Sequence, residues 1–181
     1  SKTSKPLFGM KPYVIKKVNG VKIGILGLTT RETPLVTKAE NVKGVKFLDP
    51  VATAAKFVPQ MKKEGAEIVV ALTHLGFDDD KILAEKVKGI DFIVGGHSHT
   101  ELMTPAKVGN TVILQTKSYG RFLGKMELVY DKKAKKVVSY TDKNELIPLL
   151  HSDITPDPAV VAIVEKYNKQ IAPMMEKVVG Q

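Results

Sequence analysis

The sequence predicts an α/β fold, and three observations carry this prediction. First, residues 67–73 and 91–96 are short apolar runs with the length of buried strands. Second, residues 79–88 between them have helical character, so the unit reads strand–helix–strand. Third, a further strand and helix precede this unit between residues 21 and 63. Strand–helix–strand units are almost always parallel and right-handed, so we expect a parallel sheet at the centre of the chain.

The first elements are predicted to form a β-hairpin. Residues 13–18 have strand character, and residues 21–28 read as a buried strand. The Asn19-Gly20 pair between them favours a type I′ turn, in which both central residues have positive φ.

A helix is predicted after an irregular stretch over residues 29–48. Asp49 is a good N-cap, Pro50 suits the first turn, and apolar residues follow at helical spacing. Pro59 should kink the last turn of this helix, because proline lacks the amide hydrogen. Gly65 suits the position just beyond its carboxyl end.

The character of the sequence changes after His99. Residues 111–115, 123–131 and 137–141 read as strands joined by short turns, which favours an antiparallel meander. A last helix is predicted from Asp157, with one apolar face.

Composition and charge exclude several classes of function. The formal net charge is +9, but only Arg31 and Arg121 are arginines, and the lysines are spread along the chain. Nucleic-acid grooves favour arginine forks interleaved with aromatic residues, so we expect a solvated lysine surface and no nucleic-acid partner. Cysteine is absent, which excludes disulfides and thiolate metal sites. No apolar run approaches the roughly 18 residues of a membrane span.

Histidines follow the ends of the two central strands. His74 ends one strand, and His97 and His99 follow the other; the chain has only four histidines. The carboxyl ends of parallel strands meet at one sheet edge, where α/β folds bind ligands. In an extended segment His97 and His99 leave on the same face, with Ser98 on the other. Because imidazole is the commonest side-chain metal ligand, convergence of these three rings predicts a metal site.

The residues alone leave the type of metal site open. Three imidazoles could form one zinc site with a water as fourth ligand, whereas a two-metal hydrolase would need bridging carboxylates. The nearby acids, Asp78–Asp79–Asp80, are better explained as an N-cap and first helical turn. Asp91 precedes its strand and should lie at the opposite sheet edge. His151 is expected to be a surface residue of a linker.

These motifs resemble those of a known family. The runs Thr-His74-Leu-Gly and Gly-Ile-Asp-Phe-Ile-Val-Gly-Gly-His97-Ser-His99-Thr resemble the later metal motifs of the calcineurin-like metallophosphoesterases. The closest branch is that of the 5′-nucleotidases and UDP-sugar hydrolases. Residues 21–34 and 114–124 are also similar to that branch, so the resemblance covers nearly the whole chain.

The resemblance implies a fold, a cofactor and a substrate class. The fold would be part of a four-layer αββα sandwich. Two divalent metal ions, zinc or manganese, would be bound, with His74 and His97 on one ion and His99 on the other. A metal-bound hydroxide would attack the phosphorus of a nucleotide substrate such as a nucleoside 5′-monophosphate. The branch also implies a periplasmic, cell-surface or secreted location.

The sequence departs from the family pattern in its earlier motifs. Asp-x-His, Gly-Asp and Gly-Asn-His followed by an acid do not occur. We therefore expect no catalytic acid or base in this chain and no activity of the chain alone. Residues 1–153 would be the second half of a catalytic domain, and residues 154–181 a linker helix toward a substrate-binding domain. The expected partner is the missing amino-terminal half or a second copy of the chain.

Three alternatives remain open at this point. Two are enzymes, namely a thiosulfohydrolase relative and a 2′,3′-cyclic-nucleotide phosphodiesterase. The third is a non-catalytic binding module that keeps the fold and the three histidines.

Overall fold

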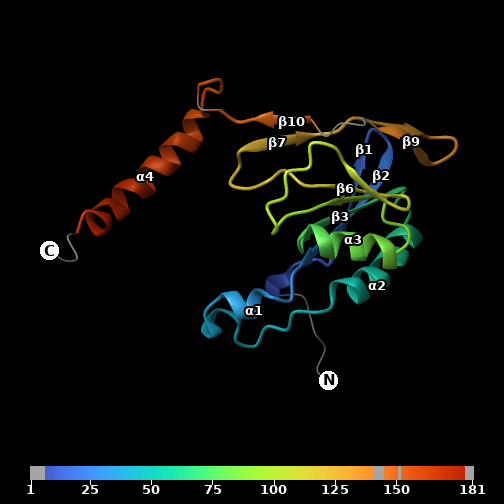
Figure 1. Ribbon diagram of the computed structural model, residues 1–181, viewed down its shortest axis with the longest axis horizontal. Helices are drawn as coiled ribbons and strands as arrows, with labels where there is room; N and C mark the ends of the chain where they lie inside the picture. The colour runs from blue at the N-terminus through green and yellow to red at the C-terminus, as the bar shows by residue number, and fades with distance from the viewer. Residues whose placement is uncertain (1–6, 141–144, 151, 178–181) are drawn as a thin grey trace. The chain divides into compact units, whose positions relative to one another are not determined.

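The computed structural model describes residues 7–140, 145–150 and 152–177 (Figure 1). The chain divides into two compact units, Ser1–Pro148 and Leu149–Gln181. His151, expected at a linker surface, lies outside the described residues. The strands are β1 Tyr13–Val18, β2 Val21–Thr29, β3 Ile68–His74, β4 Phe92–Val94, β5 Ala106–Val108, β6 Thr111–Leu114, β7 Phe122–Lys125, β8 Leu128–Asp131, β9 Lys136–Tyr140 and β10 Glu145–Pro148. The helices are α1 Thr33–Val36, α2 Pro50–Lys63, α3 Phe77–Lys86 and α4 Pro158–Met175, with short 3₁₀ turns at Leu7–Gly9 and Ala39–Val42.

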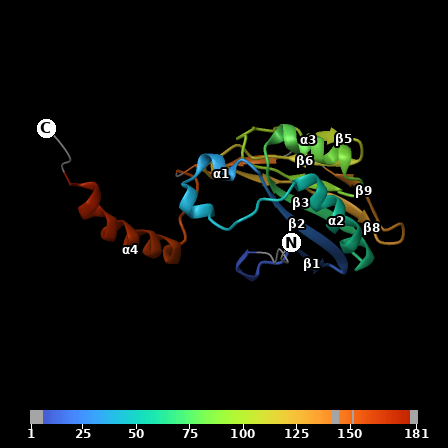
Figure 2. The same ribbon diagram turned by 90° about the horizontal axis from the view of Figure 1, so that it is seen from below.

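A six-stranded mixed sheet in the order β1-β2-β3-β4-β6-β5 forms the centre of the first unit, which confirms the α/β prediction. β1 lies at one edge and β5 at the other, as Figure 2 shows. The four inner strands β2, β3, β4 and β6 are parallel, and the two edge strands are antiparallel to their neighbours. The carboxyl ends of four strands therefore meet at one edge of the sheet.

The predicted hairpin and helix caps are present. Asn19 and Gly20 both have positive φ, at 50° and 87°, as a type I′ turn requires. Asp49 caps α2 by accepting a 2.8 Å hydrogen bond from the amide of Ala52. Asp157 caps α4 in the same way, and Pro59 lies inside α2 without ending it.

Helices α2 and α3 cover one face of the sheet (Figure 1). Alternate residues of each strand point to this face, so Val69 and Ala71 of β3 pack with Ile93 of β4 and Ile113 of β6. The helices contribute buried apolar residues to the same core, among them Ala54, Val58, Met61, Leu83 and Ala84.

The opposite face of the sheet differs from the prediction. We expected an antiparallel meander after His99. β6 instead pairs with β4 in parallel, because the short β5 hairpin returns the chain to the amino-terminal edge. The β8–β9 hairpin then packs its apolar residues on this face, against a second cluster that comprises Val21, Ile68, Phe92 and Val112. The chain therefore covers part of that face itself.

Candidate metal centre

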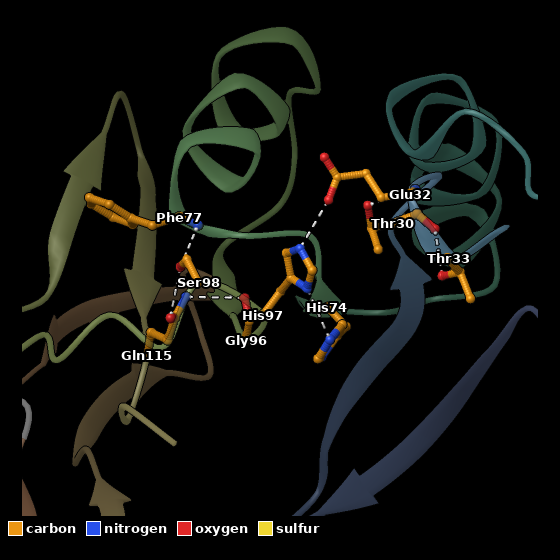
Figure 3. Close-up of polar contacts among 9 residues, drawn as sticks. All are labelled: Thr30, Glu32, Thr33, His74, Phe77, Gly96, His97, Ser98 and Gln115. Carbon is orange, nitrogen blue, oxygen red and sulfur yellow. Dashed lines mark hydrogen bonds and ion pairs between the residues drawn. The ribbon is translucent and has the colours of Figure 1, made fainter. Parts of the chain in front are cut away.

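Three side chains gather at the carboxyl edge of the parallel strands. Glu32 follows β2, His74 ends β3, and His97 follows β4 by three residues. The register pairs Thr29 of β2 with His74, so these strand ends are level with one another. Figure 3 shows His97 between the other two side chains. The predicted position of His74 and His97 at one sheet edge is thus confirmed.

The two imidazoles face each other through ring nitrogens. His97 Nδ1 lies 3.3 Å from His74 Nε2, and the ring centroids are 5.0 Å apart at an interplanar angle of 64°. On its other side, His97 Nε2 lies 3.1 Å from Oε2 of Glu32. His97 is therefore held by a partner at each nitrogen.

The segment that carries His97 and His99 is not extended, contrary to the prediction. Both histidines have positive φ, at 80° and 55°, in the left-handed region that non-glycine residues rarely adopt. Consequently the two rings diverge. His97 turns toward His74, whereas the ring of His99 lies 5.3 Å from that of Tyr119. Backbone strain of this kind concentrates at functional sites.

A buried glutamine fixes this strained turn. Gln115, at the end of β6, accepts hydrogen bonds at its Oε1 from the hydroxyl of Ser98 at 3.0 Å and the amide of Thr100 at 2.5 Å. Its Nε2 donates to the carbonyl of Gly96 at 3.4 Å. Ser98 also accepts a 3.0 Å hydrogen bond from the amide of Phe77 in the first turn of α3 (Figure 3). The histidine turn is thus tied to both β6 and α3.

Asp80 has a different role from the one expected. Gly76, with φ of 99°, occupies the N-cap of α3, so the three acids fall inside the first turn and Asp80 is fully buried. Its Oδ1 accepts a 2.7 Å hydrogen bond from the hydroxyl of Thr73. Its Oδ2 has no hydrogen-bond partner. Burial raises the pKa of Asp80 to about 6, because the charged form loses its hydration; nearby Asp79 adds to this effect.

The nitrogen pair fits a metal ion, although the described residues do not complete a site. Two imidazole nitrogens on one tetrahedral zinc ion, each at about 2.0–2.1 Å, would be about 3.3 Å apart. This matches the separation of His97 Nδ1 and His74 Nε2. Within the described part of the chain, no group of three or more His, Cys, Asp or Glu residues is placed to hold a metal ion. Asp91 pairs with Val69 and Lys62 at the amino ends of the strands, away from the histidines.

Sequence reasoning missed Glu32, Gln115 and the burial of Asp80. Glu32 lies in the stretch 29–48, which has no regular pattern in the sequence. The position of Glu32 in the sequence could have indicated this site. It is the first acid after a parallel strand, and so it falls at the ligand-binding edge of the sheet. Gln115 directly follows β6 at that same edge, but its role depends on a turn that no local pattern indicates.

Comparisons with curated proteins place the chain among nucleotide phosphoesterases. It is 33% identical over 190 residues to a 5′-nucleotidase of Diplobatis ommata, covering 94% of this chain and 32% of the relative. It is 34% identical over 177 residues to the trifunctional nucleotide phosphoesterase protein YfkN of Bacillus subtilis, covering 95% of this chain and 12% of the relative. A snake venom 5′-nucleotidase of Naja atra is 31% identical, covering 94% of this chain and 34% of the relative.

Solved structures agree with this placement. The 5′-nucleotidase precursor of Thermus thermophilus matches with a TM-score of 0.77 at 28% identity, covering 94% of this chain and 36% of that one. The sulfate thiohydrolase SoxB of the same organism matches with a TM-score of 0.81 at 25% identity, covering 96% and 31%. No family model matches the sequence.

The fold matches that of a solved 5′-nucleotidase precursor over 94% of this chain. Over most of its length the chain is similar to the 5′-nucleotidases that its motifs predicted, and it spans about a third of the length of the 5′-nucleotidases it matches.

Proposed function

We propose that the chain is part of a phosphoesterase that hydrolyses nucleoside 5′-monophosphates or related nucleotides, in which it supplies one side of a two-metal centre. The 3.3 Å approach of His97 Nδ1 to His74 Nε2 at the carboxyl sheet edge carries this proposal. The names of the relatives support the substrate class. His74 and His97 would hold one divalent ion, zinc or manganese, and His99 would hold the other.

The part of this chain in the reaction is to present imidazoles in a fixed arrangement. A pair of divalent ions in such a centre polarises phosphoryl oxygens and generates a nucleophile at neutral pH. Gln115 and Ser98 hold the turn that carries His97 and His99, so the imidazoles are positioned before a metal binds. The family's acid and base residues belong to motifs absent from these 181 residues. We therefore propose that the chain alone does not turn over nucleotides.

Metal binding is tested by calorimetric titration with Zn²⁺. We expect weak binding that His74→Ala and His97→Ala each abolish and His99→Ala reduces. His151→Ala, which removes the fourth histidine, serves as the matched control and should bind as the parent does. Binding should also weaken as the pH falls, because protons compete for the imidazoles. Unchanged affinity in both His74→Ala and His97→Ala would reject the proposed centre.

Catalysis is tested with AMP as substrate and Zn²⁺ or Mn²⁺ present. The 181-residue chain should release phosphate no faster than the metal alone. A longer protein that contains this sequence together with the earlier family motifs should be active, and His97→Ala in it should remove most of that activity. Turnover by the isolated chain above the metal blank would refute the division of the active site.

A second candidate reaction is hydrolysis of a thiosulfate ester. The likeness to the sulfate thiohydrolase SoxB, at 25% identity, specifically favours it. Parallel assays of the longer protein with AMP, 2′,3′-cyclic AMP and a thiosulfate ester separate the three chemistries, since each requires a different leaving group. We expect AMP to give the highest kcat/KM.

We further propose that the protein works outside the cytoplasm and that its partner is an amino-terminal half or a second copy of the chain. The similarity to a snake venom enzyme supports an exported protein. Within the described residues, no helix is both long and apolar enough to cross a membrane. Fractionation of the source cells, followed by immunodetection, tests the location; recovery only from cytosol would refute it.

A further inference from the structure

In the part of the chain that the structure describes, Glu32 is the one acid whose side chain contacts the pair His74 and His97. Its Oε2 lies 3.1 Å from His97 Nε2, whereas the opposite ring nitrogen, Nδ1, faces His74. An ionised carboxylate can only accept hydrogen bonds, so this contact requires a proton on Nε2 of His97. A neutral imidazole with its proton on Nε2 has a free lone pair on Nδ1. The contact with Glu32 thus selects which nitrogen of His97 is available as a ligand.

The backbone around Glu32 is anchored to the strand that carries His74. Thr30 is buried, and its amide donates a 3.0 Å hydrogen bond to the carbonyl of His74. The hydroxyl of Thr30 accepts a 3.1 Å hydrogen bond from the amide of Glu32. The carbonyl of Thr30 accepts one at 3.2 Å from the hydroxyl of Thr33 (Figure 3). Glu32 and His74 are therefore placed relative to one another through a single buried residue.

We propose that Glu32 is a positioning residue that holds His97 in the Nε2–H tautomer and so leaves Nδ1 free to bind a divalent metal ion together with His74 Nε2. Metal-bound histidines generally donate their second N–H to a carboxylate or carbonyl, which fixes the ring and its tautomer. The ligand role of Nδ1 rests on the proposed function, whereas the tautomer assignment does not. In the metal-free chain Nδ1 of His97 accepts from His74 Nε2–H. To bind an ion through Nε2, neutral His74 would take the Nδ1–H tautomer, so its proton would move from Nε2 to Nδ1.

The tautomer is measured by long-range ¹H–¹⁵N correlation spectra of ¹⁵N-histidine-labelled, metal-free chain at about pH 8. We expect His97 to carry its proton on Nε2 in the parent. Glu32→Gln keeps the side-chain length but offers both a donor and an acceptor, so the His97 signals should move toward a mixture of tautomers. Glu32→Asp is one methylene shorter and should do the same. Glu40→Gln, in the same connecting segment, is the control and should leave the His97 signals in place.

The consequence for metal binding is measured by Zn²⁺ titration of the same variants. Loss of such a carboxylate typically weakens metal affinity by about 10- to 100-fold, and we expect this range for Glu32→Gln. Amide spectra that match the parent outside the site establish that the variants fold. The Glu40→Gln variant should bind Zn²⁺ as the parent does.

The two proposals fail in different ways. A proton on Nδ1 of His97 in the parent, or an unchanged tautomer in Glu32→Gln and Glu32→Asp, would overturn the inference even if Zn²⁺ binds. Unchanged Zn²⁺ affinity in both His74→Ala and His97→Ala would instead reject the metal centre. In that case the spectra alone decide the tautomer, and an Nε2–H signal lost in the Glu32 variants would still support the positioning role of Glu32.

Discussion

Thr73 donates a 2.7 Å hydrogen bond from its hydroxyl to Oδ1 of Asp80, which joins the end of β3 to the first turn of α3 beneath the histidine turn. The bond satisfies one carboxylate oxygen, and the other has no partner. An ionised carboxylate that is buried and half-satisfied is costly, because one hydrogen bond does not replace its lost hydration. Asp80 is thus a local source of instability next to the candidate metal centre.

The first prediction concerns the pH dependence of stability. The pKa of Asp80 is raised in the folded chain from 3.8 to about 6, so the folded state favours the protonated form. The associated stability is fully present below about pH 4 and is lost as the pH rises through about 6. The loss should approach about 3 kcal/mol at neutral pH. Urea unfolding between about pH 4 and pH 8 should show this contribution in the parent, and Asp80→Asn should remove it.

The control for this experiment is Asp78→Asn, which changes an exposed acid of the same helical turn. Its unfolding free energy should follow the parent's pH dependence. An equal fall in stability with pH in Asp80→Asn and the parent would show that Asp80 is not the titrating group.

The second prediction concerns Gly95, which lies over Asp80. A Cβ atom at position 95 would lie 2.2 Å from Oδ2 of Asp80, which the buried Thr73 contact holds in place. We expect Gly95→Ala to lower the unfolding free energy by about 1–3 kcal/mol, as overpacking does. Gly27→Ala is the matched control, since nothing lies within 4 Å of its added Cβ, and it should change stability little. Combining Gly95→Ala with Asp80→Ala should cost less than the sum of the single changes, because the clash is removed.

The third prediction concerns the hydrogen bonds that hold the histidine turn. Gln115→Leu places an apolar side chain in the buried site and leaves the Thr100 amide without its acceptor. It also removes the hydrogen bond to the Gly96 carbonyl, which keeps those from the amides of Gly76 and Ser98. Each unsatisfied buried group costs about 1–3 kcal/mol. We expect lower stability in urea and weaker Zn²⁺ binding, since the turn carries His97. Gln60→Leu, at an exposed position of α2, should affect neither measurement, and equal effects of the two substitutions would contradict the role of Gln115.

The sequence was informative wherever a local pattern determines structure. Asn19-Gly20 requires positive φ at two successive residues, and few turns other than a tight hairpin provide it. The strand–helix–strand pattern determined the parallel order, which brought His74 and His97 to one edge. These predictions succeeded because strand direction and turn geometry depend on residues close in the chain.

The failures came from contacts between distant segments. Asp80 is buried because the helix begins earlier than expected, at Phe77, with the first amide capped by Ser98 from another loop. His99 diverges from His97 because the turn between them is left-handed, and Gln115, from the end of β6, holds it there. No pattern within residues 95–100 contains this information.

The last prediction concerns self-association. Leu72, on the sheet face opposite α2 and α3, is 54% exposed, and Val129 and Val138 on the β8–β9 hairpin are 58% and 51% exposed. Exposed apolar surface favours association, because burying it removes apolar area from water. We expect the purified chain to be larger than a single-chain monomer in light scattering, with the mass confirmed by intact mass spectrometry. Val129→Lys combined with Val138→Lys should shift it toward the monomer, whereas Leu35→Lys, a control at an exposed position of α1, should not. A monodisperse monomer of the parent chain would mean that the hairpin covers enough of the sheet for the chain to remain alone.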